Sequence, residues 1–372
     1  MAATRTGGLS TDALQAGRVA PDTAGAPTGA DLKRLAAELA ADFDRACRSG
    51  LIEADARFAG SRVRLRYASE RLHALQAPAF HRLSPPEEPG PEMTVCVWET
   101  QSRALVGDWR ARLRAVAPAA AAPQVVSGSM TAVLQPEVGN LVVVDADAGT
   151  AWFTVPAGGP MGWWELGSPL RPALHRLLSA KGLTLMHAGA VAAGDRGALI
   201  TGRGGSGKST LALACLDHGL DYVGEDYVVL ESGPPPRAHL IYTTAKLDAP
   251  SLELLPRMRA AAISSAGEGG VKAVLDLARD FGESMRASTA VHAIVLPDVH
   301  GGARGARLVR VPASAAVLAL APTSTLHSHD PAGSALAMAA AVARTVPTYR
   351  LELGEPAAGA RAVAELLEGS IA

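Results

Sequence analysis

The sequence has few aromatic residues and almost no net charge, and these shortages exclude several classes of function. Phe, Trp and Tyr make up only 4% of the 372 residues, so few side chains are available to stack on single-stranded nucleic acid. The 35 Lys and Arg residues nearly balance the 36 Asp and Glu residues, which leaves a net charge of −1 and no basic field for a phosphate backbone. We therefore expect no nucleic-acid partner.

Cysteines and long apolar runs are equally scarce. Cys47, Cys96 and Cys215 are far apart, odd in number and form no C-x-x-C pair, so we expect neither a disulfide framework nor a structural zinc site. The first residues lack the apolar run of a signal peptide. No stretch of about 18 residues is continuously apolar without proline or charge. These absences predict a soluble, cytoplasmic protein that has no membrane partner.

Composition and periodicity divide the first half of the chain into two parts. Residues 1–30 are rich in Gly, Ala, Thr and Pro without periodicity, which predicts a disordered arm. In residues 31–165, apolar side chains at three- and four-residue spacing predict an amphipathic helix over Asp31–Cys47. A period of two follows and predicts strands, hence a smaller, β-rich lobe. Further strands are expected at Thr94–Glu99, Leu141–Asp145 and Trp152–Val155.

One strand and two breaks of this lobe are clearest in the sequence. Val63, Leu65 and Tyr67 alternate with three arginines, which predicts a strand with one wet, basic face. A proline-rich break at Ser84–Pro91 and an Ala/Pro linker at Ala115–Pro123 separate the strand candidates.

Residues 166–372 have the pattern of an α/β layer fold, because strand and helix segments alternate. Ser168, followed by Pro169, predicts a helix start with the hydroxyl as cap, and the helix should run to about Ala180. The chain closes with helices expected over Ser334–Thr345 and Ala358–Leu367 and a strand over Thr348–Leu353.

A phosphate-binding loop is the most specific motif. Residues 202–209 fit the Walker A pattern G-x-x-x-x-G-K-[ST]. Gly197–Thr201 predicts the strand that enters the loop, and Ser209–His218 the helix that leaves it. Glycines let backbone N–H groups surround the phosphates, Lys208 would reach the β- and γ-phosphates, and the Ser209 hydroxyl would bind Mg²⁺. The expected nucleotide contacts are Gly202, Arg203, Gly204, Gly205, Ser206, Gly207, Lys208, Ser209 and Thr210.

The loop alone does not distinguish a kinase from an ATPase or a GTPase, because the discriminating residue is a second acidic group. Two candidates exist. Glu225 and Asp226 precede an apolar strand, and Asp226 lies only 18 residues beyond Lys208. Asp298 ends the strand-like segment Ala293–Pro297 and resembles an ordinary Walker B aspartate, although after Pro297 we expect it to be a turn residue.

Together these segments resemble a known family. The run from His187 to Val191, the loop GALITGRGGSGKST and the acid pair before a strand resemble the HPr kinase/phosphorylase catalytic domain, including its spacing from histidine to loop. The resemblance covers about Ser168 to Leu367, and the N-terminal lobe carries no matching motif. Four later segments resemble HPr-kinase-like proteins of peptide natural-product pathways, among them kinases of lasso-peptide precursors: Tyr242–Asp248, His292–Asp298, Leu320–Leu326 and Val346–Gly354.

The resemblance implies a P-loop kinase domain with a central sheet flanked by helices, and it implies roles for particular residues. Asp226 would hold Mg²⁺ directly or through water, together with Ser209. Glu225 would be the catalytic base, although the family usually has Asp-Asp where this chain has Glu-Asp. His187 would lie beside the phosphates as a positioning or charge-stabilising group. The family's phosphate-facing arginine has no match, but Lys246 would supply positive charge.

Plainer interpretations stay open for several residues. His187 would be a core histidine if the loop were absent. Lys246 is equally well explained as a solvated surface charge. The run His327–Asp330 suggests a metal site, but such short mixed runs are mostly exposed loops. Trp163 and Trp164 are expected to pack between the lobes rather than to stack on a ligand.

The sequence thus predicts an ATP- and Mg²⁺-dependent kinase that transfers the γ-phosphoryl group to a hydroxyl, most simply a serine of a peptide or small protein. Three alternatives remain. The first two are a kinase of a small hydroxylated metabolite and a nucleotide-binding regulator that lacks transfer activity. A conventional P-loop ATPase that uses Asp298 is a third. The family resemblance also implies a homo-oligomer.

Overall fold

The computed structural model describes residues 26–81, 92–116, 123–135, 137–299, 305–328 and 333–370 and shows a mixed α/β protein with several sheets. The predicted disordered arm lies largely outside the described residues, and its last residues already belong to helix α2 (Gly29–Ala46). The proline-rich break at Ser84–Pro91 and most of the Ala/Pro linker also lie outside them. No helix within the described ranges is long and apolar enough to cross a membrane.

The N-terminal half forms a seven-stranded sheet in the order β1-β2-β3-β7-β6-β5-β4. Strand β3 runs parallel to β2 and to β7, and the other pairs are antiparallel. The strands are β1 (Ile52–Phe58), β2 (Ser61–Tyr67), β3 (Glu92–Thr100), β4 (Gln124–Ser127), β5 (Met130–Gln135), β6 (Asn140–Asp145) and β7 (Thr150–Pro156).

Strand β2 confirms the predicted alternation, with Val63, Leu65 and Tyr67 buried. Its arginines, however, do not form a free basic face. The Arg62 guanidinium binds Asp55 at 2.6 Å and Arg66 binds Glu53 at 2.8 Å, because antiparallel pairing places the acidic side chains of β1 opposite the arginines of β2.

Helices cover both faces of this sheet. Helix α2, capped by Thr28, and α4 (Arg103–Val116) bury one face around Trp98. Helix α3 (Glu70–Gln76) and α6 (Arg171–Ser179) cover the other. Helices α3 and α4 are absent from the sequence prediction of a mostly β lobe.

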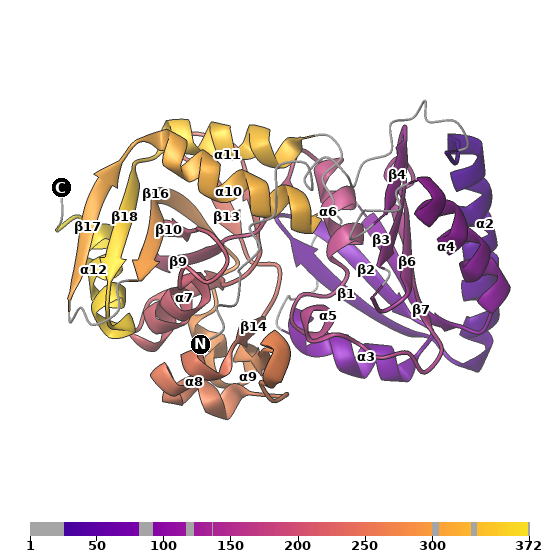
Figure 1. Ribbon diagram of the computed structural model, residues 1–372, viewed down its shortest axis with the longest axis horizontal. Coiled ribbons are helices and arrows are strands. Elements are labelled where there is room, and N and C mark those ends of the chain that lie inside the picture. The colour runs from indigo at the N-terminus through magenta and orange to yellow at the C-terminus, as the bar shows by residue number, and fades with distance from the viewer. Residues whose placement is uncertain are drawn as a thin grey trace, which may run out of the picture.

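The second half forms a nine-stranded sheet around the parallel strands β10, β16 and β18 (Figure 1). Helices α7 (Lys208–Asp217) and α12 (Pro356–Glu368) pack on one face, and α10 (Ala313–Ser328) and α11 (Ser334–Thr345) on the other. The predicted bounds of α11 and β18 are confirmed. The strands are β8 (Thr184–Met186), β9 (Gly189–Ala193), β10 (Arg196–Ile200), β11 (Asp221–Gly224), β12 (Val228–Glu231), β13 (Arg237–His239), β16 (Ser288–Val299), β17 (Ala306–Val311) and β18 (Thr348–Leu353).

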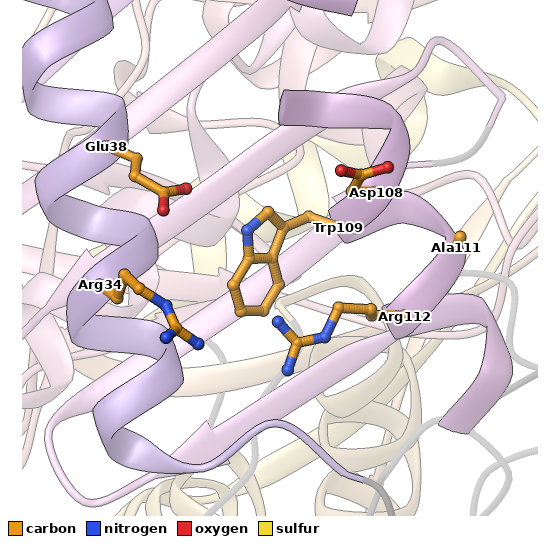
Figure 2. A pocket seen from close by; sticks show the side chains of 6 residues that line it. All are labelled: Arg34, Glu38, Asp108, Trp109, Ala111 and Arg112. Atoms are coloured by element: carbon orange, nitrogen blue, oxygen red, sulfur yellow. The ribbon is translucent and has the colours of Figure 1, made fainter. Parts of the chain in front are cut away.

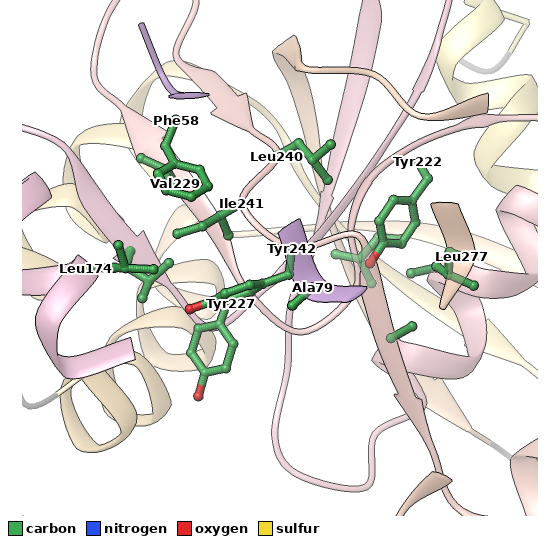
Figure 3. Close-up of a cluster of buried hydrophobic side chains, with 14 of the residues drawn as sticks. Phe58, Ala79, Leu174, Tyr222, Tyr227, Val229, Leu240, Ile241, Tyr242 and Leu277 are labelled. Atoms are coloured by element: carbon green, nitrogen blue, oxygen red, sulfur yellow. The ribbon is translucent and has the colours of Figure 1, made fainter. Parts of the chain in front are cut away.

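A shared core joins the two halves, with Phe58 of the first sheet and Tyr242 of the second half among its side chains (Figure 3). The Phe80 ring packs against both, with its centroid 6.0 Å from that of Phe58 and 5.9 Å from that of Tyr242. A small two-stranded sheet, β14 (Thr244–Leu247) and β15 (Ala273–Asp276), continues from this point, flanked by α5 (Trp163–Gly167), α8 (Ala249–Leu254) and α9 (Leu277–Phe281). Trp163 and Trp164 lie in α5, which contacts α3 and the two-stranded sheet. The division of the chain at residue 165 stays a prediction.

The helix start predicted at Ser168 is wrong. Ser168 follows the short helix α5, and α6 begins at Arg171 after Leu170. The reason is tertiary: the Ser168 hydroxyl accepts a hydrogen bond from Lys246 Nζ at 2.6 Å, so it does not cap a helix. Helix α6 ends at Ser179, in agreement with the expected end.

Candidate active site

The glycine-rich loop, predicted to bind phosphate, has the expected arrangement of strand, loop and helix. Strand β10 ends at Ile200 and α7 begins at Lys208, with residues 202–207 between them. Gly205 and Gly207 have φ angles of 76° and 92°, a left-handed conformation that disfavours any residue with a Cβ. A Cβ on Gly207 would also lie 2.9 Å from Val299. The glycine pattern therefore matches a requirement of the backbone.

Lys208 lies folded over this loop. Its Nζ donates hydrogen bonds of 2.9 Å to the carbonyl oxygens of Gly202 and Arg203. Burial lowers the pKa of the ammonium group, while the charges of Asp226 and Glu225 act in the opposite direction. The buried Ser206 hydroxyl has no hydrogen-bond partner among the described residues. A cation and an unsatisfied hydroxyl in one glycine-rich loop fit the oxygens of a nucleotide's phosphates.

Asp226 is the centre of a buried polar cluster. One carboxylate oxygen, Oδ1, lies 3.0 Å from His187 Nε2, and Oδ2 forms an ion pair with Lys246 Nζ. Ser168 Oγ lies 3.4 Å from Oδ2. Although burial acts to raise the pKa of Asp226, Lys246 and His187 hold that pKa well below its ordinary value. Asp226 is therefore ionised at neutral pH.

Glu225, the neighbouring carboxyl, has the opposite electrostatic environment. It is 1% exposed, its Oε2 accepts the Lys246 backbone N–H at 3.2 Å, and its Oε1 has no hydrogen-bond partner among the described residues. Burial, followed by the charge of Asp226, raises the pKa of Glu225 to about 7, against the opposing effects of Lys246, the Ser209 hydroxyl and Lys272. Two adjacent carboxyls with separated pKa values are typical of acid–base chemistry.

Several residues of this cluster carry no local sequence signal. The Tyr227 ring stacks on His187 with centroids 5.3 Å apart. Arg171 Nη1 donates to the Tyr227 hydroxyl at 2.9 Å, and the Lys246 ammonium lies 5.6 Å from the Tyr227 ring centroid. The interpretation of Lys246 as a surface charge is wrong, because the residue is 3% exposed and bound to Asp226. Ser168, Arg171 and Tyr227 were missed, since only tertiary packing brings them here.

The two expected metal ligands, Ser209 and Asp226, differ in how their oxygen atoms are surrounded. Ser209 is the second residue of α7, and its hydroxyl lies near enough to Glu225 to lower the pKa of that carboxyl. One oxygen of Asp226 already binds the Lys246 ammonium and the other the His187 ring, whose pKa is lowered by burial, so of its two predicted modes, contact with Mg²⁺ through water fits better. Within the described ranges, no group of three or more His, Cys, Asp or Glu side chains could hold a metal ion.

The rival acidic residue, Asp298, is not in a turn as expected. It lies inside β16, opposite Glu352 of β18. Because β16 runs parallel to β10, Asp298 reaches the same sheet edge as the phosphate loop, and it stays a candidate for an ATPase metal site. In the run His327–Asp330, the last two residues lie outside the described part of the chain, and the side chains of the first two are not described.

A cavity of about 550 Å³ lies elsewhere, between α2 and α4 on the N-terminal sheet (Figure 2). Arg34 and Arg112 both bind Asp31, at 2.5 and 3.4 Å, and Arg112 also covers the Trp109 ring. The two arginines that line this cavity are therefore already paired with Asp31. The cavity also lies far from the glycine-rich loop between β10 and α7 in Figure 1. The cluster around Asp226 is therefore the stronger candidate for an active site. The lining residues are Arg34, Glu38, Asp108, Trp109, Ala111 and Arg112.

A scan of the chain against protein-family models finds no match, and neither does a search of curated proteins. Among solved structures, the chain is similar to the HPr(Ser) kinase/phosphatase from Coxiella burnetii. The alignment has 14% sequence identity, covers 50% of this chain and 95% of that chain, and has a TM-score of 0.27. We therefore argue the function from the geometry of the site.

Proposed function

We propose that this chain is an ATP- and Mg²⁺-dependent kinase of the HPr-kinase-like type that phosphorylates a hydroxyl group. One observation carries the proposal: beside a P-loop lysine and serine lies a buried carboxyl, Glu225, whose pKa is near 7 and whose Oε1 has no partner in the described structure. A general base is most effective when its pKa is near the working pH. The acceptor we propose is a serine of a peptide or small protein, with a natural-product precursor peptide as the first to test.

The residues of the cluster would divide the chemistry as follows. Glu225 accepts the proton of the acceptor hydroxyl as its oxygen bonds to the γ-phosphorus and the bond to the β,γ-bridging oxygen breaks, which releases ADP. Lys208 turns from the loop carbonyls to the phosphate oxygens. Ser209, and Asp226 through water, would hold Mg²⁺, which would supply charge neutralisation. Lys246 adds positive charge near the transferring group, and His187 positions the Asp226 carboxylate.

The remaining expectations extend the proposal to the whole chain. Residues 166–372 would be the catalytic domain, with a central sheet flanked by helices. Residues 31–165 would recognise the substrate or form oligomer contacts. A homo-oligomer acting in the cytoplasm completes this proposal.

The test is transfer of labelled phosphate from Mg·ATP into a size-fractionated lysate of the source organism. Wild type is compared with Glu225→Gln, which keeps the side-chain shape, and with Glu253→Gln, a change at an exposed glutamate of α8. We expect label in the peptide and small-protein fraction with wild type and Glu253→Gln. Glu225→Gln should transfer none, while its affinity for Mg·ATP stays within about twofold.

Other outcomes would contradict the proposal in distinct ways. Label in the metabolite fraction would identify a small-molecule kinase. Tight Mg·ATP binding by wild type without transfer to any fraction would identify a regulator. Transfer that survives in Glu225→Gln would remove Glu225 as the base.

A further inference from the structure

The turn between α5 and α6 is held by an unusual density of hydrogen bonds. The Gly167 carbonyl accepts from Thr244 Oγ1 at 2.8 Å, and the Pro169 carbonyl accepts from the Tyr242 hydroxyl at 2.8 Å. The Ser168 hydroxyl accepts from Lys246 at 2.6 Å, and the Leu170 N–H donates to Glu165 Oε2 at 3.2 Å. Each of the four residues from 167 to 170 therefore has its own fixed partner.

Leu170 has a conformation that a leucine rarely adopts. Its φ of 62° and ψ of 17° place it in the left-handed region, immediately before α6. Such a conformation persists only where surrounding contacts enforce it, and it is common at functional sites. In this turn, the Leu170 backbone N–H donates its hydrogen bond to the Glu165 carboxylate.

Burying the Glu165 carboxyl group costs desolvation free energy. It is fully buried, and its Oε1 accepts a hydrogen bond of 3.0 Å from Gln135 Nε2. Gln135 is the last residue of β5 in the N-terminal sheet. Its side-chain oxygen, Oε1, accepts a hydrogen bond of 3.0 Å from Asn140 Nδ2. A carboxylate without solvent requires such donors, so the N-terminal sheet fixes the position of Glu165.

The turn places two side chains against the active site. Ser168 bridges Lys246 and Asp226. Arg171 binds the Tyr227 hydroxyl and lies over the Tyr227 ring, 5.3 Å from its centroid, and that ring stacks on His187. A displaced turn would therefore move both partners of the His187–Asp226 pair.

We propose that Glu165 is a positioning residue through which the N-terminal sheet, by way of Gln135, holds the Asp226 cluster in its reactive arrangement. This inference rests on the proposed function, because it assigns a role to residues outside the reacting groups. It gives the N-terminal half a task in the reaction besides any contact with the substrate.

The experiment compares Glu165→Gln and Gln135→Leu with a matched control, Asp42→Asn. Asp42 is also a buried carboxylate held by hydrogen bonds, from Trp98 Nε1 at 2.8 Å, Thr100 Oγ1 at 2.7 Å and Arg45 Nη2 at 3.0 Å, but on the opposite face of the N-terminal sheet. Each variant is measured below its melting temperature for kcat of phosphoryl transfer, for Mg·ATP affinity, and for amide hydrogen exchange across residues 165–172.

Both variants at the Glu165 contact should lower kcat by about tenfold to a hundredfold with the Mg·ATP affinity nearly unchanged, and amide exchange of the turn should accelerate. Asp42→Asn should lower the melting temperature without either effect. Equal kcat losses in all three variants, or an unchanged exchange rate of the turn in Glu165→Gln, would overturn the proposal. Because amide exchange needs no turnover, it tests the contact even if wild type transfers no phosphate.

Discussion

Replacing Glu225 with glutamine should make the fold more stable at alkaline pH while it abolishes transfer. The carboxyl has a pKa of about 7 in the folded chain, against an ordinary value of 4.5. Because the folded value is the higher one, the stability from this group is fully present below pH 4.5 and is lost as pH rises through 7. At 1.36 kcal/mol per pH unit, deprotonated Glu225 costs the fold about 3 kcal/mol at pH 8.

Glutamine has nearly the same shape and does not titrate, so the variant lacks this pH dependence. The free energy of unfolding of Glu225→Gln, relative to wild type, should increase by about 2 kcal/mol between pH 5.5 and pH 8. Comparing two pH values cancels the constant cost of any unpaired amide group.

The assay is urea unfolding at several pH values without nucleotide and with EDTA, because a bound cation would lower the pKa of Glu225. Exposed Glu253→Gln is the control and should follow wild type at every pH. If the stability curves of Glu225→Gln and wild type run parallel from pH 5.5 to pH 8, Glu225 does not have a raised pKa. The argument for its role as base would then be refuted.

Three further predictions test other parts of the site. Lys246→Met should lower the free energy of unfolding at pH 8 by about 3 kcal/mol, because it removes the cationic partner of the half-buried Asp226 and leaves His187, whose pKa is lowered by burial, as a neutral hydrogen-bond partner; an unchanged urea midpoint would contradict this. Gly207→Ala, strained at φ 92° and close to Val299, should weaken Mg·ATP binding at least about tenfold by calorimetry. Asp226→Asn should abolish Mg²⁺-dependent transfer and Asp298→Asn should not; the reverse result would move the metal site to β16.

Part of the fold could be predicted because its signals are local. The bounds of α11 and β18 could be predicted from the pattern of residues within each segment. The alternation of apolar and charged residues in β2 likewise marks its buried face. Helix α4 was missed although Val106, Trp109 and Leu113 are buried at helical spacing, because its many arginines and its glycine weaken the pattern.

The glycine-rich loop is encoded locally, since glycine is the residue that accepts the backbone angles at 205 and 207 and the order of strand, loop and helix is a pattern of neighbouring residues. The sequence also singled out Glu225 and Asp226 as the acidic candidates. The chemical behaviour of these two carboxyls, in contrast, depends on packing. Burial raises the pKa of one carboxyl, and Lys246, distant in sequence, keeps the other ionised. Such effects depend on desolvation and on charges that only packing brings together, which no local pattern encodes.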